Sequence, residues 1–201
     1  MQRESNFELL RIVSMLLLIA HHFCVHSGIL NTDSSNKIIT FIFLPVGKIC
    51  FVAFIAISMW FLVDKSFKAT RWLKTWCEVF FYSVTFCLIS LIINKPNSFF
   101  GVIHSLGSSF FPIAGNSHGF ASSYLLFYLL FPFISKLMSI TNKKQHIILL
   151  GIVFYAQIFE QILNKITFYS QPIFSELLLF VFCYLLMFCL KKYPIKKILI
   201  I

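Results

Sequence analysis

The chain has 201 residues, of which 59% are hydrophobic and only 12% are charged. A soluble domain of this length has too little interior to bury that much apolar surface, so the composition excludes a soluble globular protein and predicts an integral membrane protein. The formal net charge of +10 comes largely from short basic clusters between apolar runs, a pattern typical of membrane orientation signals, so no nucleic-acid partner is predicted.

Six segments are long and apolar enough to cross a bilayer, which takes roughly 20 residues per helix. They cover residues 12–30, 40–63, 76–94, 119–138, 146–164 and 173–190. The sequence therefore predicts an all-α, polytopic transmembrane helix bundle of about six spans, forming one domain over residues 1–201. The stretch 95–118, rich in Gly, Ser and Phe, is expected to form a re-entrant or interfacial hairpin.

The loops between these segments alternate in charge. Lysine and arginine gather in 65–74, 136–144 and 191–197, whereas the other loops carry few charges. Because basic loops stay in the cytoplasm, the pattern predicts that both chain termini are cytoplasmic.

The first apolar segment holds ionisable residues where lipid contact would be costly. Arg11 precedes His22 by eleven residues, which at ~100° and ~1.5 Å per residue puts them on one helix face, roughly 16 Å apart. His21 lies ~100° off that face, and His26 is close to it. Because such groups usually face a bundle interior or a wet cavity, we expect His22 to point inward, with His21 and His26 in support. The alternative is a histidine that only hydrogen-bonds a neighbouring helix.

A second group of cations follows the second span. Lys68, Arg71 and Lys74 are spaced by three residues, so they share one side if the segment is helical. They would suit a phosphate-rich ligand, although an orientation anchor explains them equally well. Glu78, four residues after Lys74, is placed either to support this group or to pair with Lys74 alone. No metal-binding motif is present, so no metal site is predicted.

Four blocks of the sequence resemble the membrane-bound acyltransferase 3 family, the bacterial O-acyltransferases that modify surface polysaccharides. The first block, SNFELLRIVSMLLLIAHHF, has the family's Arg, ten residues and His, here Arg11 and His22. The second is VGKICFVAFIAISMWFL, and the third is DKSFKATRWLKTWCEVFFYS, in which Lys68 and Arg71 match a basic-x-x-Arg element. The fourth is FFPIAGNSHGFASSYLLFYLLFPFISKL.

The chain departs from the family pattern at four positions within these blocks. Cys50 stands where the family usually has Gly, Met59 and Trp60 stand where it has Gly-Tyr, and Gly119 stands where it has Trp. Family members also have more helices than the six predicted here. The resemblance therefore implies either a partner chain or oligomer that supplies the missing helices, or a C-terminally truncated chain.

The resemblance implies an enzyme of the bacterial cell membrane that moves an acyl group, commonly acetyl, from cytoplasmic acyl-CoA to a hydroxyl of an extracytoplasmic glycan or lipid-linked sugar. It implies acetyl-CoA as the donor substrate and no bound cofactor. Lys68, Arg71 and Lys74 would hold the CoA phosphates. Arg11 would bind donor phosphate or stabilise developing negative charge, and His22 would act as general base or acyl carrier.

Two other interpretations remain open from the sequence. One is a transporter or channel component, in which Arg11, His21 and His22 line a path for a proton or an anion. The other is an inactive truncated fragment, for which the apolar ending after KKYPIKK is the indication.

Overall fold

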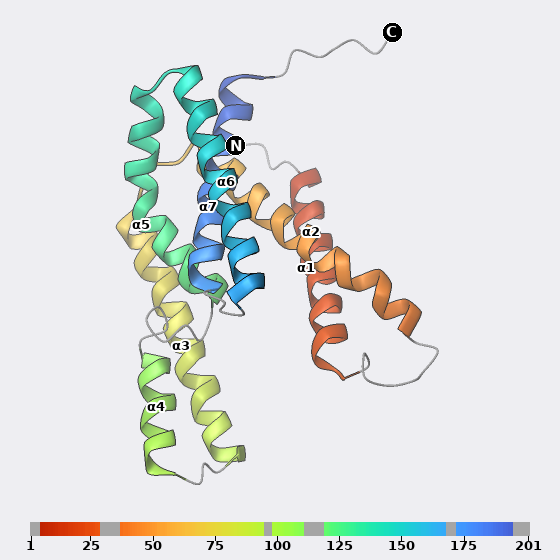
Figure 1. Ribbon diagram of the computed structural model, residues 1–201. Coiled ribbons are helices and arrows are strands. Elements are labelled where there is room, and N and C mark those ends of the chain that lie inside the picture. The colour runs from red at the N-terminus through yellow and green to blue at the C-terminus, as the bar shows by residue number, and fades with distance from the viewer. Residues whose placement is uncertain (1–4, 29–36, 95–97, 111–118, 168–171, 195–201) are drawn as a thin grey trace. The chain divides into compact units, whose positions relative to one another are not determined.

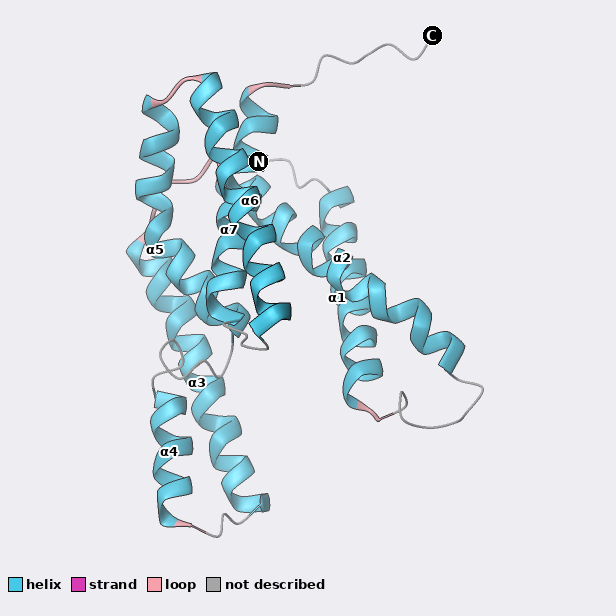
Figure 2. Ribbon diagram, in the orientation of Figure 1, coloured by secondary structure: helices cyan, strands magenta, loops and turns pink. Residues whose placement is uncertain are grey.

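A computed structural model describes residues 5–28, 37–94, 98–110, 119–167 and 172–194. Within these ranges the chain forms helices and no strand (Figures 1 and 2). The described helices, in chain order, are α1 (Ser5–His26), α2 (Lys37–Leu62), α3 (Ala69–Asn94), α4 (Phe99–Phe110), α5 (Gly119–Ile140), α6 (Lys143–Thr167) and α7 (Pro172–Lys192). The prediction of an all-α fold is confirmed.

Four of these helices are long and apolar enough to cross a membrane: Ser5–His26, Phe41–Leu62, Ala69–Ile93 and Gly119–Ile140. Their surfaces carry large apolar side chains, such as Phe133 at 72% exposed and Ile92 at 74%. Exposed apolar surface on this scale needs a lipid environment. The prediction of a membrane protein is thus supported. The predicted spans 146–164 and 173–190 lie within α6 and α7, which are not among these four helices, so the count of six spans stays a prediction.

The observed helix ends differ from the predicted ones in a consistent way. α1 begins at Ser5 rather than at residue 12, and α3 begins at Ala69 rather than at residue 76. A hydropathy pattern stops at the first charged residue, whereas a helix continues through charges that lie at the bilayer edge. Arg11, Arg71 and Lys74 are consequently helical residues.

Residues 95–118 hold a helix that the sequence pattern did not predict as such. α4 occupies Phe99–Phe110 and packs beside α3 (Figure 1). With 12 residues it is too short to span a bilayer, so a rule based on spanning length passes over it. The described part of this stretch is the single helix α4, so the hairpin expected within 95–118 stays a prediction; residues 95–97 and 111–118 lie outside the described residues.

The described chain divides into two compact units, Met1–Asp64 and Lys65–Ile201, where the sequence predicted one domain. The first unit is the hairpin of α1 and α2. The second holds α3 to α7, in which α7 packs against both α5 and α6, and α3 packs against α4 and α5.

The core of the second unit is aromatic. Phe127 of α5 stacks on Phe180 of α7 with ring centroids 5.7 Å apart, and Phe131 meets Tyr184 edge to face at 5.6 Å. All four side chains are at least 99% buried. Such ring pairs add favourable dispersion and quadrupole contacts to close packing, and these interactions do not depend on water.

The turn between α5 and α6 is closed by polar contacts. The amide of Gln145 donates to Asn142 Oδ1, while the amide of Asn142 donates to Gln145 Oε1, each over 3.0 Å. This reciprocal pair satisfies free donors at the start of α6. The fully buried His146 follows, with its Nε2 2.9 Å from the carbonyl oxygen of Met138 and its Nδ1 3.0 Å from the hydroxyl of Tyr193. It ties the turn to the end of α7.

Candidate functional site

The residues of α1 that face α2 include positions spaced seven residues apart. Phe7, Ser14 and His21 lie at that spacing, and Arg11 lies between the first two. Phe7 stacks on Trp60 at 6.1 Å, and Ser14 is buried. A seven-residue repeat keeps one stripe of a helix against its neighbour, so the packing of α2 decides which side chains are covered.

Arg11 lies in this interface without full hydrogen bonding. Its guanidinium carbon is 5.9 Å from the centroid of the Phe61 ring on α2, a cation–π contact. Its Nε is buried, and among the described residues it has no hydrogen-bond partner. A buried cationic donor without an acceptor is costly, so the site favours an acceptor, and an anion most of all.

His21 is the imidazole that packs against α2. Its Nδ1 lies 3.2 Å from the backbone oxygen of Phe43, and a Cβ added to Gly47 would collide with its ring. Glycine at position 47 therefore makes room for the imidazole. Because a carbonyl oxygen only accepts, Nδ1 carries the hydrogen of this contact.

His22 lies outside that interface, where it is exposed. Its ring meets His21 edge to face at 5.6 Å and stacks on His26 at 5.8 Å, with 10° between the ring planes. The spacing in the sequence predicted that His22 rather than His21 would point inward. The difference arises because α2 selects residues at a seven-residue spacing, which favours position 21, whereas a straight 3.6-residue helix aligns position 22 with Arg11.

The second predicted group lies at the start of α3. Lys68, Arg71 and Lys74 are all exposed, and the amides of Arg71 and Trp72 donate to the carbonyl of Lys68 over 3.0 and 3.3 Å. The indole of Trp72 donates to the carbonyl of Leu125 over 3.1 Å, which fixes this end of α3 on α5. The backbone is thus held while the cationic side chains face outward, as a binding site for a soluble anion requires.

Glu78 pairs with Lys74, as one of the two sequence interpretations expected. Lys74 Nζ lies 4.0 Å from Glu78 Oε1, and the side chains are 79% and 56% exposed. An exposed pair at this spacing contributes little to stability, about 0.3–0.5 kcal/mol.

The two predicted groups fall in different units. Arg11, His21, His22 and His26 belong to Met1–Asp64, whereas the three cations and Glu78 belong to Lys65–Ile201. Within the described residues, no group of three or more His, Cys, Asp or Glu side chains is arranged to hold a metal ion, the three neighbouring imidazoles of α1 included.

Sequence reasoning missed two polar features. One is His146, whose buried role depends on Tyr193, 47 residues later. The other is Glu176 of α7, which accepts a hydrogen bond from Ser123 over 3.3 Å beside Gly119. Gly119 was the one sequence feature that could have indicated this contact, because the absence of a side chain there lets the Glu176 carboxylate approach the first turn of α5.

Comparison with known proteins adds no identification. No protein-family model, no curated protein and no solved structure matches the chain. The resemblance to the acyltransferase family therefore depends on the four quoted blocks alone.

Proposed function

We propose that the chain is a membrane-embedded O-acyltransferase that moves an acyl group, by preference acetyl, from cytoplasmic acyl-CoA to a hydroxyl of an extracytoplasmic glycan. The observation that carries the proposal is the unpaired, buried Nε of Arg11 on a helix that also presents histidines. Membrane helices rarely retain an arginine without a partner unless it serves binding or chemistry. The sequence resemblance supplies the reaction class.

The imidazoles of α1 suit a general base. In the proposed reaction, His22 takes the proton of the acceptor hydroxyl while the hydroxyl oxygen attacks the thioester carbonyl. The C–S bond then breaks, and the imidazolium returns the proton to the departing CoA thiolate. His21, held by Phe43 in one tautomer, fixes the position of the His22 ring that it contacts edge to face. His26, stacked on His22, adds support on the other side.

The cations have separate roles in this proposal. The guanidinium of Arg11 lies too far along α1 from His22 to act on the same carbonyl, so in this proposal it holds a phosphate of the donor. Lys68, Arg71 and Lys74 bind the phosphates of CoA through charge-assisted hydrogen bonds. Basic loops stay in the cytoplasm, which agrees with a cytoplasmic donor and with both termini on that side of a bacterial cell membrane.

The experiment uses membranes from cells that produce the full chain, supplied with acetyl-CoA labelled in the acetyl group. Label in the cells' surface polysaccharide and lipid-linked glycans is measured at equal protein level. We expect transfer by the wild-type chain and a drop of about 100-fold in His22→Ala, the loss typical of a missing general base. Phe23→Ala, a neighbouring exposed side chain of α1, is the matched control and should retain transfer.

Equal transfer by the wild type and His22→Ala would remove His22 from the mechanism. No transfer by either chain, with the protein present in the membrane, would contradict the enzymatic proposal.

A second function is favoured by one observation, the row of three imidazoles in ring contact at 5.6 and 5.8 Å. Neighbouring histidines suit a proton relay, so a transporter or channel component is the competing proposal. Proteoliposomes loaded with a pH-sensitive dye separate the two. A transporter gives a proton flux that needs His22 and no acetyl-CoA, whereas the acyltransferase gives none.

A further inference from the structure

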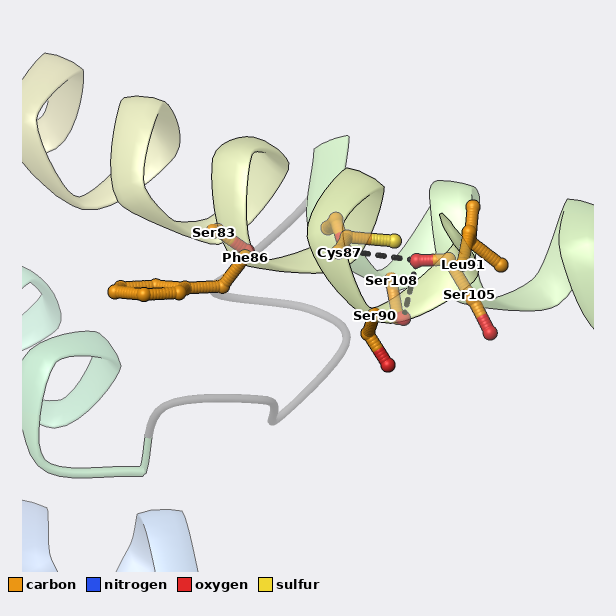
Figure 3. Close-up of a pocket in the computed structure, with 8 residues that line it drawn as sticks. Ser83, Phe86, Cys87, Ser90, Leu91, Ser105 and Ser108 are labelled. Atoms are coloured by element: carbon orange, nitrogen blue, oxygen red, sulfur yellow. Dashed lines mark hydrogen bonds between the residues drawn. The ribbon is translucent and has the colours of Figure 1, made fainter. Parts of the chain in front are cut away.

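The hairpin of α3 and α4 forms an open pocket of about 240 Å³ that lies outside the proposed catalytic group (Figure 3). Its lining combines five hydroxyls with one thiol and two apolar side chains, and holds no charged residue. The hydroxyls belong to Ser83, Ser90, Ser105, Ser108 and Ser109. A volume below the ~300 Å³ at which pockets for drug-sized ligands begin limits the ligand to a small one, such as a single ring.

Ser83 is the residue that points to a ligand. Its side chain lines the pocket, the residue is only 3% exposed, and among the described residues its Oγ has no hydrogen-bond partner. A mid-helix serine normally returns its hydroxyl to a carbonyl of the preceding turn, as Ser109 does to Ser105 over 2.8 Å. A buried hydroxyl without a partner is costly to leave unsatisfied, so a ligand that bonds to it would be favoured.

The hydroxyls of α4 can accept hydrogen bonds from a ligand, whereas Ser83 can donate one. Ser108 and Ser109 both donate to the carbonyl oxygen of Ser105, over 3.0 and 2.8 Å, so their hydroxyl hydrogens are engaged and their oxygens accept (Figure 3). The pocket therefore presents a donor at Ser83 and acceptors from α4. An alcohol is an uncharged group that combines both roles.

Close packing alone does not account for this arrangement. Small residues such as serine and cysteine let membrane helices approach each other, which explains their presence between α3 and α4. Packing would fill the space between the helices, yet a pocket remains and the Ser83 hydroxyl is left unpaired. The apolar lining comes from Leu91 and from Phe86, whose ring Figure 3 shows directed away from Ser90, Ser105 and Ser108.

We propose that this pocket binds one neutral sugar ring, through hydrogen bonds to the serine hydroxyls and contact of the ring's C–H face with the apolar part of the lining. The ligand agrees with the glycan acceptor of the proposed function, but the inference concerns binding and follows from the pocket's own chemistry. The same chemistry has two sources, a soluble glycoside and the headgroup of a glycolipid, and the experiment separates them.

The experiment follows alkylation of two cysteines by N-ethylmaleimide in the full chain, reconstituted in phosphatidylcholine nanodiscs and analysed by peptide mass spectrometry. Cys87 lines the pocket, whereas Cys77, exposed on the same helix, is the internal reference. One arm adds methyl β-glucoside to the solution, and the other includes monoglucosyl diacylglycerol in the bilayer. A ligand at twice its Kd leaves one-third of the pockets open, so Cys87 should react about threefold more slowly. Cys77 should keep its rate.

The variant Ser83→Ala tests the assigned hydroxyl. We expect its glycoside affinity to fall about fivefold, the loss of one neutral hydrogen bond, with thermal stability unchanged or raised because the removed hydroxyl had no partner. Ser139→Ala, an exposed serine of α5 bonded to Lys136, is the matched control and should bind as the wild type does.

Several results would overturn the inference: no slowing of Cys87 in either arm, equal slowing of Cys77, unchanged affinity in Ser83→Ala, or equal protection by the anion gluconate. The outcome is independent of catalysis. Protection of Cys87 without any acetyl transfer leaves the sugar site standing and the proposed function contradicted, and transfer without protection does the reverse.

Discussion

The interface between α5 and α7 and the interface between α1 and α2 both join closely packed apolar helices, yet they differ in chemistry. The first joins aromatic rings such as Phe127 and Phe180, which are almost completely buried. The second includes Arg11, Ser14 and His21 beside its aromatic contacts.

The difference separates stability from function. Aromatic rings stabilise a bundle in lipid by dispersion alone, whereas an arginine and a histidine in the same surroundings raise the free energy unless their polar atoms are satisfied. Nothing about packing α1 on α2 requires those residue types. Their presence is why the proposed chemistry is placed on α1, and the predictions below test each side of this contrast.

The largest effect on stability is expected at the aromatic interface. Phe180→Ala removes a ring that contacts Phe127, Phe120 and Tyr124, and should lower the free energy of unfolding by about 3 kcal/mol because the neighbouring rings cannot fill the cavity. Unfolding in mixed micelles with increasing SDS measures it. Phe133→Ala, at an exposed site of α5, should change the midpoint little, and an equal shift in both variants would contradict the assignment of the core.

An intermediate effect on stability is expected where α2 contacts the imidazole of His21. Gly47→Ala places a methyl group against the His21 ring, so the ring must move and its contact with Phe43 is lost, which should cost about 1–3 kcal/mol. Gly151→Ala on α6 is the matched control, since no atom outside its own helix backbone lies near the added methyl, and it should raise stability by about 0.5–1 kcal/mol. The same unfolding assay applies, and a neutral Gly47→Ala would show that His21 does not pack as described.

The smallest effect is expected at the exposed pair of α3. Lys74→Ala removes the 4.0 Å contact with Glu78 and should alter stability by less than about 0.5 kcal/mol, with no further change at high salt. The proposed role of Lys74 in CoA binding also predicts that this variant has a higher KM for acetyl-CoA in the transfer assay. A large loss of stability with an unchanged KM would mean that Lys74 is structural.

The helices were largely predictable because a bilayer imposes a simple condition on length and hydropathy. Where that condition does not apply, prediction failed. α4 is too short to span, and the beginnings of α1, with Arg11, and of α3, with Arg71 and Lys74, lie before the predicted apolar windows. Both errors have the same cause. Hydropathy reports which residues lie in the apolar part of the membrane, but it does not report where a helix begins and ends.

The sequence predicted which residues belong to the candidate site but not how their side chains are arranged. Their spacing identified Arg11 and the histidine pair, but a single helix cannot reveal which of two adjacent rings meets its neighbour. That choice depends on Gly47, 26 residues after His21, and on the repeat with which α2 packs. The unpaired hydroxyl of Ser83 is likewise a property of two helices together, and no pattern within α3 predicts it.

The most direct test of the central contrast is Arg11→Leu, with acetyl transfer and thermal stability measured on the same preparation. We predict unchanged or higher stability, because an unpaired buried donor is replaced by an apolar side chain, together with a fall in transfer of about 100-fold as the charged contact with a donor phosphate is lost. Retained transfer, or a chain that no longer folds, would contradict the claim that α1 keeps its arginine for chemistry rather than for structure.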